Sequence, residues 1–254
     1  MIRGALIAAA ILTIAFAAPA AAQGRIQFLP RYDFHLAAER LSQDDPRFVW
    51  DTNFGGEVDF VDYRAGRTTF AANYEAVLGQ QFRNFDPNQG NYLLDLSSSA
   101  RTHGFEFAAL LHHTSRHLSD RFKRLPVDWN MLGVTVEHGL RRGDVFIRPR
   151  GNILGVLLKS NVDYTWEANV GVDVRVPLRA HVSAISGGNV RVVGVDGSLH
   201  RETQTGRRIE GGVRFEGERG AIEVVVAGER RIDAYPLDVS SLSWWSAGFR
   251  FVSR

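Results

Sequence analysis

The sequence predicts an all-β protein, an antiparallel transmembrane β-barrel of about 12 strands with short periplasmic turns and longer extracellular loops. Three observations indicate this fold: apolar and polar residues alternate with period two, the alternating segments are long, and the connections between them alternate between short and long. Composition alone does not distinguish a membrane barrel from a soluble protein, because 44% hydrophobic residues, 23% charged residues and a mean hydropathy of −0.15 suit both. The pattern therefore carries the prediction.

The N-terminal segment predicts export. Arg3 precedes an apolar run from Ala5 to Ala18, and small residues follow up to Ala22. A basic start, an apolar stretch and a small-residue cleavage site are typical of a secretory signal peptide. We therefore expect residues 1–22 to be a signal peptide and residues 23–254 to be a single outer-membrane β-barrel domain. The alternative is an N-terminal membrane anchor that is retained.

The charge balance and the absence of cysteine indicate which partners and which cellular compartment to expect. Thirty basic residues against 28 acidic ones leave a net charge of +2, which is too balanced for a dedicated nucleic-acid-binding protein. The chain has no Cys, which suits an exported protein that needs no disulfides. We expect the bacterial outer membrane as the location and outer-membrane lipids as the partners.

The clearest alternation lies in residues 164–176. One face is apolar and the other carries charges of both signs, as expected where the apolar face meets lipid and the polar face lines the lumen. The apolar face consists of Tyr164, Trp166, Ala168, Val170, Val172, Val174 and Val176.

The same reading gives twelve strands along the chain. They lie near residues 26–40, 54–64, 67–83, 91–101, 104–115, 129–139, 143–157, 163–176, 179–196, 207–217, 220–231 and 242–252. The even-numbered connections are short and most odd-numbered ones are longer, which is typical of outer-membrane barrels. Pro149 and Gly151 interrupt the strand 143–157, and the pair Gly187-Gly188 predicts a bulge or an extra turn in the strand 179–196, so ten or fourteen strands remain open.

Aromatic residues at the predicted outer ends of strands are expected to form an interfacial girdle facing lipid. They are Tyr92, Trp129, Tyr164, Trp166, Trp244 and Trp245.

One cluster of residues has the composition of a catalytic site. Four of the eight histidines fall in residues 103–117. Alternation directs His112 to the lumen and places His113 and Ser115 on the outer face at the extracellular end of a strand, with Asn130 beside them on the next strand. A hydroxyl nucleophile, an imidazole base and an amide that orients the imidazole make a complete acyl-transfer site.

This arrangement resembles known outer-membrane families. His113-Thr114-Ser115 followed by Asn130 is similar to the His-x-Ser…Asn arrangement of outer membrane phospholipase A, a twelve-stranded barrel, and to the His-x-Ser…Glu of lipid A 3-O-deacylase. The run from His113 to Asp120 resembles an eight-residue motif of an uncharacterised outer-membrane family of unknown function. The chain departs from the phospholipase at Arg116 and His117, and no counterpart of its calcium-site pattern is recognised.

Other interpretations of the same rim remain open. The polar residues can simply mark the exit of a strand into water, and the protein can be a pore or a structural barrel without activity. His113, His117 and Asp120 have a spacing that would converge on zinc if the rim were helical. The sequence establishes no cofactor, so calcium and zinc both remain open.

Two further expectations concern the surroundings of the site. A basic cluster in the adjoining loop is expected to contact lipid phosphates. A site on the outer wall offers only half a cleft, so we expect weak activity in the monomer, which increases when the second barrel of a homodimer or a disordered outer leaflet supplies the missing wall. The basic cluster consists of Arg116, Arg121, Lys123 and Arg124.

Overall fold

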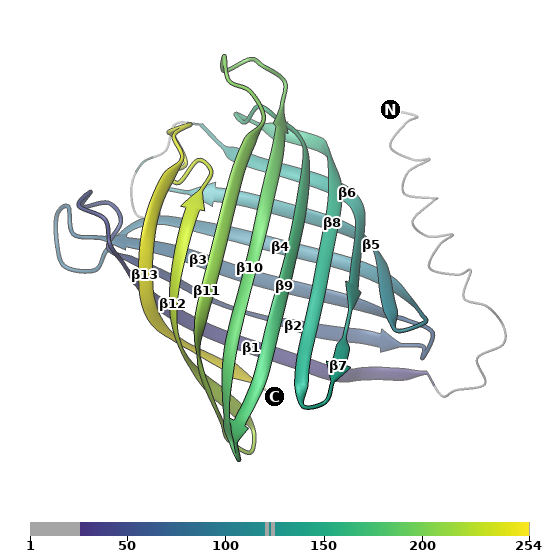
Figure 1. Cartoon of the computed structure of the whole chain (residues 1–254). Helices are drawn as coiled ribbons and strands as arrows, with labels where there is room; N and C mark the ends of the chain where they lie inside the picture. The colour runs from purple at the N-terminus through teal and green to yellow at the C-terminus, as the bar shows by residue number, and fades with distance from the viewer. Residues whose placement is uncertain (1–25, 120–121, 123–124, 254) are drawn as a thin grey trace, which may run out of the picture.

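The computed structural model describes residues 26–119, 122 and 125–253, and it shows a closed antiparallel barrel (Figure 1). Each long strand pairs with its neighbour in sequence, β6 pairs with β8, and β1 pairs with β13 to close the ring. Twelve strands make up the barrel wall, and the short β7 extends the hairpin that precedes β8. The predicted fold class is confirmed, whereas the predicted signal peptide lies outside the described residues.

The strands are long enough to cross a bilayer. Their bounds are β1 Gln27–Leu41, β2 Trp50–Asp62, β3 Arg67–Gly79, β4 Asp86–Thr102, β5 Phe105–His117, β6 Val127–His138, β7 Leu140–Arg142, β8 Val145–Ser160, β9 Tyr164–Arg179, β10 Val182–Val195, β11 Gln204–Glu216, β12 Gly220–Arg231 and β13 Leu242–Ser253. In the described part of the chain, no helix is long and apolar enough to span a membrane.

The two rims of the barrel differ, as the alternating connections predict. At the rim where β1 begins and β13 ends, here called the short-turn rim, β4 and β5 are joined by His103 and Gly104 alone. Both residues have positive φ, 49° and 81°, the backbone that a tight two-residue hairpin requires. The opposite rim, the long-loop rim, carries residues 42–49, 118–126, 196–203 and 232–241. One connection there, residues 161–163, is shorter than predicted.

The predicted irregularity at Gly187-Gly188 is wrong. β10 runs through both residues in unbroken register with β9 and β11. Gly187 instead leaves room inside the lumen, because a Cβ there would lie 3.2 Å from Oδ1 of Asp173. Pro149 is likewise paired within β8, opposite Val172 of β9. Both positions therefore remain inside strands.

The outer wall of the barrel is apolar. Because this apolar belt covers long strands whose backbone groups are all paired in a closed sheet, the barrel has the form that spans a bilayer. Exposed apolar side chains on this wall include Phe34, Leu36, Phe54, Phe107, Leu111, Val134, Ile153, Val170, Ile209, Val224, Val226 and Phe249.

The aromatic girdle is only partly as predicted. Tyr92, Trp166 and Trp245 lie on the outer wall, but Trp129, Tyr164 and Trp244 are buried inside the barrel.

The physical cause of this difference is alternation. Asn130 faces outward, so its neighbour Trp129 must face inward, and the adjacent pair near residue 244 obeys the same rule. At Tyr164 a β-bulge reverses the alternation: Val195 pairs with Tyr164 whereas Gly194 pairs with Trp166, which leaves Thr165 as the extra residue.

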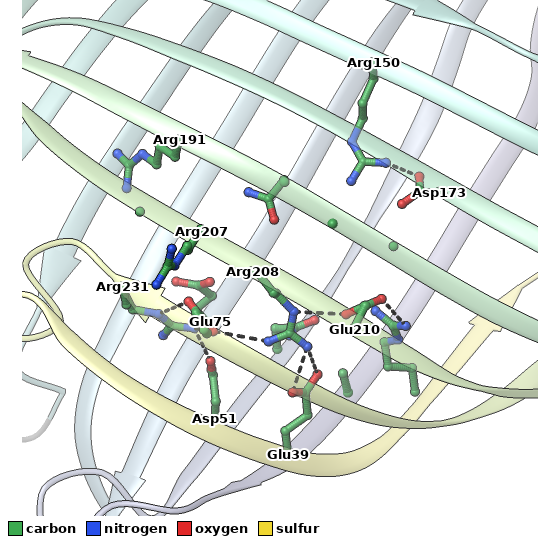
Figure 2. Close-up of a pocket in the computed structure, with 18 of the residues that line it drawn as sticks. Glu39, Asp51, Glu75, Arg150, Asp173, Arg191, Arg207, Arg208, Glu210 and Arg231 are labelled. Atoms are coloured by element: carbon green, nitrogen blue, oxygen red, sulfur yellow. Dashed lines mark hydrogen bonds and ion pairs between the residues drawn. The ribbon is translucent and has the colours of Figure 1, made fainter.

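Ion pairs connect strands across the inner face of the barrel, around the lumen (Figure 2). Arg208 of β11 binds Glu39 of β1 at 2.8 Å and Glu229 of β12 at 3.2 Å. Arg231 binds Glu229 at 2.8 Å and also pairs with Asp51 of β2. The opposed charges of the inner face therefore pair with one another from strand to strand.

Two long loops fold into the lumen at the long-loop rim. Phe48 is fully buried and stacks on Trp244 at 5.9 Å between ring centres. The carbonyl oxygen of Ala234 accepts a hydrogen bond from Gln89 of β4 at 2.9 Å. The carbonyl oxygen of Asp233 accepts one from Arg116 of β5 at 2.7 Å. Because β4 and β5 lie across the ring from β12 and β13, the segment 232–241 crosses the lumen; we call it, with residues 42–49, the plug.

A buried ion-pair network fixes the plug. Arg201 donates to Asp163 at 2.5 and 2.8 Å and to Asp233 at 2.6 and 2.8 Å. Asp163 has no exposed surface, and Tyr164 donates its hydroxyl to Asp233 at 2.6 Å. The hydrogen bonds that Arg201 donates to Asp163 and Asp233 raise the pKa of its guanidinium above the usual range, since the carboxylates favour the charged form.

The apolar wall gives a first prediction. Val134 faces lipid in the middle of β6, so Val134→Arg places a charge in the hydrocarbon and is expected to destabilise the barrel by about 2–4 kcal/mol. The measurement is urea unfolding of the barrel in lipid vesicles. The matched control is Thr135→Arg on the lumen side of the same strand, and equal losses for both variants would contradict the assignment of faces.

The plug network gives a second prediction. Arg201→Met leaves Asp163 and Asp233 buried without their cation, and we expect a loss of about 3–5 kcal/mol in the free energy of unfolding. Lys159→Met, which breaks an exposed pair with Asp196, is the control and should have a smaller effect. If the two variants unfold at the same urea concentration, the network does not stabilise the plug.

Candidate active site on the outer wall

The candidate residues lie at the end of β5, next to the long-loop rim. The strand alternates strictly there, so His113, Ser115 and His117 face outward between β4 and β6. Ser115 is opposite Tyr92 of β4, and His113 is opposite Asn130 of β6. The structure therefore places the predicted residues on one patch of the outer wall.

The first contact in this patch joins His113 to Asn130. Their atoms Nδ1 and Oδ1 are 3.0 Å apart. An amide oxygen only accepts, so the imidazole donates from Nδ1, and in the neutral ring Nε2 then keeps its lone pair. Asn130 thus holds His113 in the tautomer that a general base requires.

The second contact joins Ser115 to His117. The hydroxyl Oγ lies 2.8 Å from Nε2 of His117, whose ring packs edge-on against Tyr92 at 5.4 Å. Among the contacts of the described residues there is no hydrogen bond between Ser115 and His113. The outer-wall patch therefore contains a serine hydroxyl, an imidazole held by an amide and a second imidazole, and the hydroxyl is bonded to the second imidazole.

Sequence reasoning missed two features of this patch. Asp128 of β6 is the direct cross-strand neighbour of Ser115, which puts a carboxylate beside the hydroxyl. His117, noted only as part of a motif, makes the one hydrogen bond to Ser115 described above. Alternation from Ser115 finds His117, because the two residues lie two positions apart on one face.

The expectation for Arg116 is corrected. Its guanidinium is buried in the lumen and donates to Asp233 O at 2.7 Å and to Gln89 Oε1 at 3.1 Å, so it does not face lipid phosphates. Alternation explains this, since Arg116 follows the outward-facing Ser115. The other members of the basic cluster, Arg121, Lys123 and Arg124, lie outside the described residues.

The structure does not provide the helical geometry that the zinc-site interpretation requires. It required a helical rim, but β5 is a strand through His117, so residues four apart do not converge. Among the described residues, no group of three or more His, Asp or Glu side chains is placed to hold a metal ion. Asp120 lies outside those residues.

Comparison with known proteins supports the fold. No family model matches the chain, and no curated protein matches it. The structure of the Salmonella typhi outer membrane phospholipase (OMPLA) dimer with bound calcium is similar, with a TM-score of 0.56 and 8% identity over 96% of this chain and 97% of that chain. Outer membrane phospholipase A from Escherichia coli has a TM-score of 0.56 and 9% identity over 87% and 92% of the two chains.

A further similarity is weaker. LpxR from Salmonella typhimurium has a TM-score of 0.48 and 10% identity over 86% of this chain and 99% of that chain, which is too low to support a relationship. At such identities the likeness to the two phospholipase structures shows an outer-membrane barrel fold alone. The resemblance of residues 113–120 to an uncharacterised family remains a prediction.

The pairing of His113 with Asn130 can be tested directly. In the wild type, ¹⁵N NMR of the His113 ring at about pH 8 should show the proton on Nδ1, and Asn130→Leu should release it into a mixture of tautomers. Asn130→Asp keeps an acceptor and is the matched control. An unchanged tautomer in Asn130→Leu would show that Asn130 does not orient the ring.

Proposed function

We propose that the protein is an integral outer-membrane lipid acyl hydrolase whose nucleophile is Ser115. The observation that carries this proposal is the 3.0 Å contact that fixes the His113 tautomer through Asn130, two residues from a serine on the same lipid-facing wall. The barrel fold and its likeness to outer membrane phospholipase structures support an outer-membrane location. The paired charges and the plug do not favour a passive pore.

The chemistry follows from the three side chains. Ser115 attacks an ester carbonyl of a lipid at the outer wall while Nε2 of His113 accepts the hydroxyl proton, and Asn130 stabilises the imidazolium that forms. His113 then returns the proton to the leaving alcohol, and water releases the fatty acid from Ser115. His117 positions the hydroxyl through its 2.8 Å contact until the substrate arrives.

The surroundings suit a lipid substrate. Tyr92 and Leu94 of β4 and Leu111 of β5 are exposed on the same wall, so acyl chains can lie along it below Ser115. Since this wall provides only one side of a cleft, the homodimer expected from the sequence remains part of the proposal.

Fatty-acid release from phosphatidylethanolamine in mixed micelles tests this function. Ser115→Ala and His113→Ala should each lower the rate by about 10²-fold or more, because they remove the nucleophile and the base, whereas His117→Ala should lower it by about 10-fold. The matched control is Ser243→Ala, an exposed serine at the same rim on β13.

Each variant is first checked for heat-modifiable gel mobility, which reports a folded barrel. Full hydrolysis by folded Ser115→Ala, or none by the wild type, would refute the proposal. If His117→Ala is inactive while His113→Ala is active, the base has been assigned to the wrong imidazole.

A further inference from the structure

β5 carries a second histidine and a second hydroxyl on its opposite face. His112 and Thr114 are shifted by one residue from His113 and Ser115, so alternation directs them into the lumen, as predicted for His112. Both line the lumen cavity. One strand therefore presents a His-x-hydroxyl pair to each side of the barrel wall.

The lumen pair is completed by a carboxylate. Nδ1 of His112 lies 2.5 Å from Oδ1 of Asp95, its cross-strand neighbour on β4, and Nε2 lies 2.8 Å from Oγ1 of Thr114. Both hydrogen bonds of an acid–imidazole–hydroxyl relay are present. On the outer wall, by contrast, His113 is bonded to Asn130, while the described contacts of Ser115 include a bond to His117 and none to His113.

The direction of these bonds follows from the groups. The ionised carboxylate of Asp95 only accepts, so Nδ1 of His112 donates to it, and the neutral ring accepts the Thr114 hydroxyl proton at Nε2. This is the arrangement in which an imidazole removes a proton from an attacking hydroxyl.

An unused donor lies next to Thr114. Trp129 of β6 is its direct cross-strand partner, is 4% exposed and lines the same cavity. The buried indole N–H of Trp129 has no hydrogen-bond partner among the described residues. An unpaired buried donor is costly, and this one belongs to the residue opposite the Thr114 hydroxyl in the cavity wall, which points to an acceptor atom supplied by a ligand.

The cavity itself is large and polar. It has a volume of about 1060 Å³ and extends from Tyr164, below the plug, to Glu137 and Val252 near the short-turn rim. Charged side chains from most strands line it, including those drawn in Figure 2. Such a cavity suits a water-soluble molecule of small size and not an acyl chain.

We propose that Thr114, His112 and Asp95 form a second acyl-hydrolase site, inside the lumen, for small water-soluble carboxylic esters that enter from the short-turn rim. Oγ1 of Thr114 adds to the ester carbonyl carbon as its proton passes to Nε2 of His112, and the oxyanion accepts the indole N–H of Trp129. The bond to the alcohol oxygen then breaks, and that oxygen takes the proton from His112. Water attacks the acyl-threonine, gives a proton to His112, and releases the acid as Thr114 regains its proton.

The test uses hydrolysis of p-nitrophenyl acetate by the full-length barrel in detergent, with Ser115→Ala as the background so that the outer-wall nucleophile is absent. Adding Thr114→Val should lower kcat/KM by about 10²-fold or more, and Thr114→Ser should retain activity. Asp95→Leu should also lower kcat, because it leaves His112 without the acceptor that fixes its tautomer.

The matched control is Thr135→Val, a lumen-facing threonine on β6 outside the cavity lining. A soluble fluorophosphonate should label Thr114 in the Ser115→Ala background, as located by peptide mass spectrometry. The proposal is overturned if the folded Ser115→Ala barrel does not hydrolyse the ester, or if Thr114→Val hydrolyses it as fast as Thr135→Val. Because lipid release is measured separately, this result is independent of the outer-wall site.

Discussion

The pairing of β6 with β8 and of β1 with β13 closes the sheet, and the rest of the molecule depends on this closure. Once the ring is complete, every strand separates two solvents, lipid outside and a polar lumen inside. Successive side chains along a strand must then face lipid and lumen in turn, so apolar and polar residues alternate. This constraint determines where each side chain lies, including those of both candidate sites.

The interior is stabilised by charge instead of apolar packing along most of its length. Arg231 and Arg201 each bind two carboxylates from different strands or loops, and Arg208 binds three. Such pairs connect distant parts of the chain, because a guanidinium reaches across several strands and has a rigid fork of donors. Apolar packing is concentrated where the plug meets the wall, in one cluster around Phe48 and Ala234 and in a second around Trp129, Tyr164 and Ile232.

Alternation made most of the fold and part of the site predictable. The strand count, the two kinds of rim and the outward placement of His113 follow from local pattern. Features that depend on a single inserted residue could not be predicted in this way. The bulge at Thr165 turns Tyr164 inward, and no residue type near it indicates a bulge. The inward position of Arg116 could have been predicted from the same alternation that places Ser115 outward. Its charge favoured instead the prediction that it lies in an exposed loop.

The run His112-His113-Thr114-Ser115 gives β5 an unusual sensitivity to chain length. A one-residue insertion or deletion within the strand would exchange its two faces. His113 and Ser115 would then enter the lumen, and His112 and Thr114 would face lipid. A two-residue change would keep each pair in its own medium. Both sites are therefore kept only by insertions or deletions of an even number of residues. The length of this strand thus matters to the two sites as much as the identity of their residues.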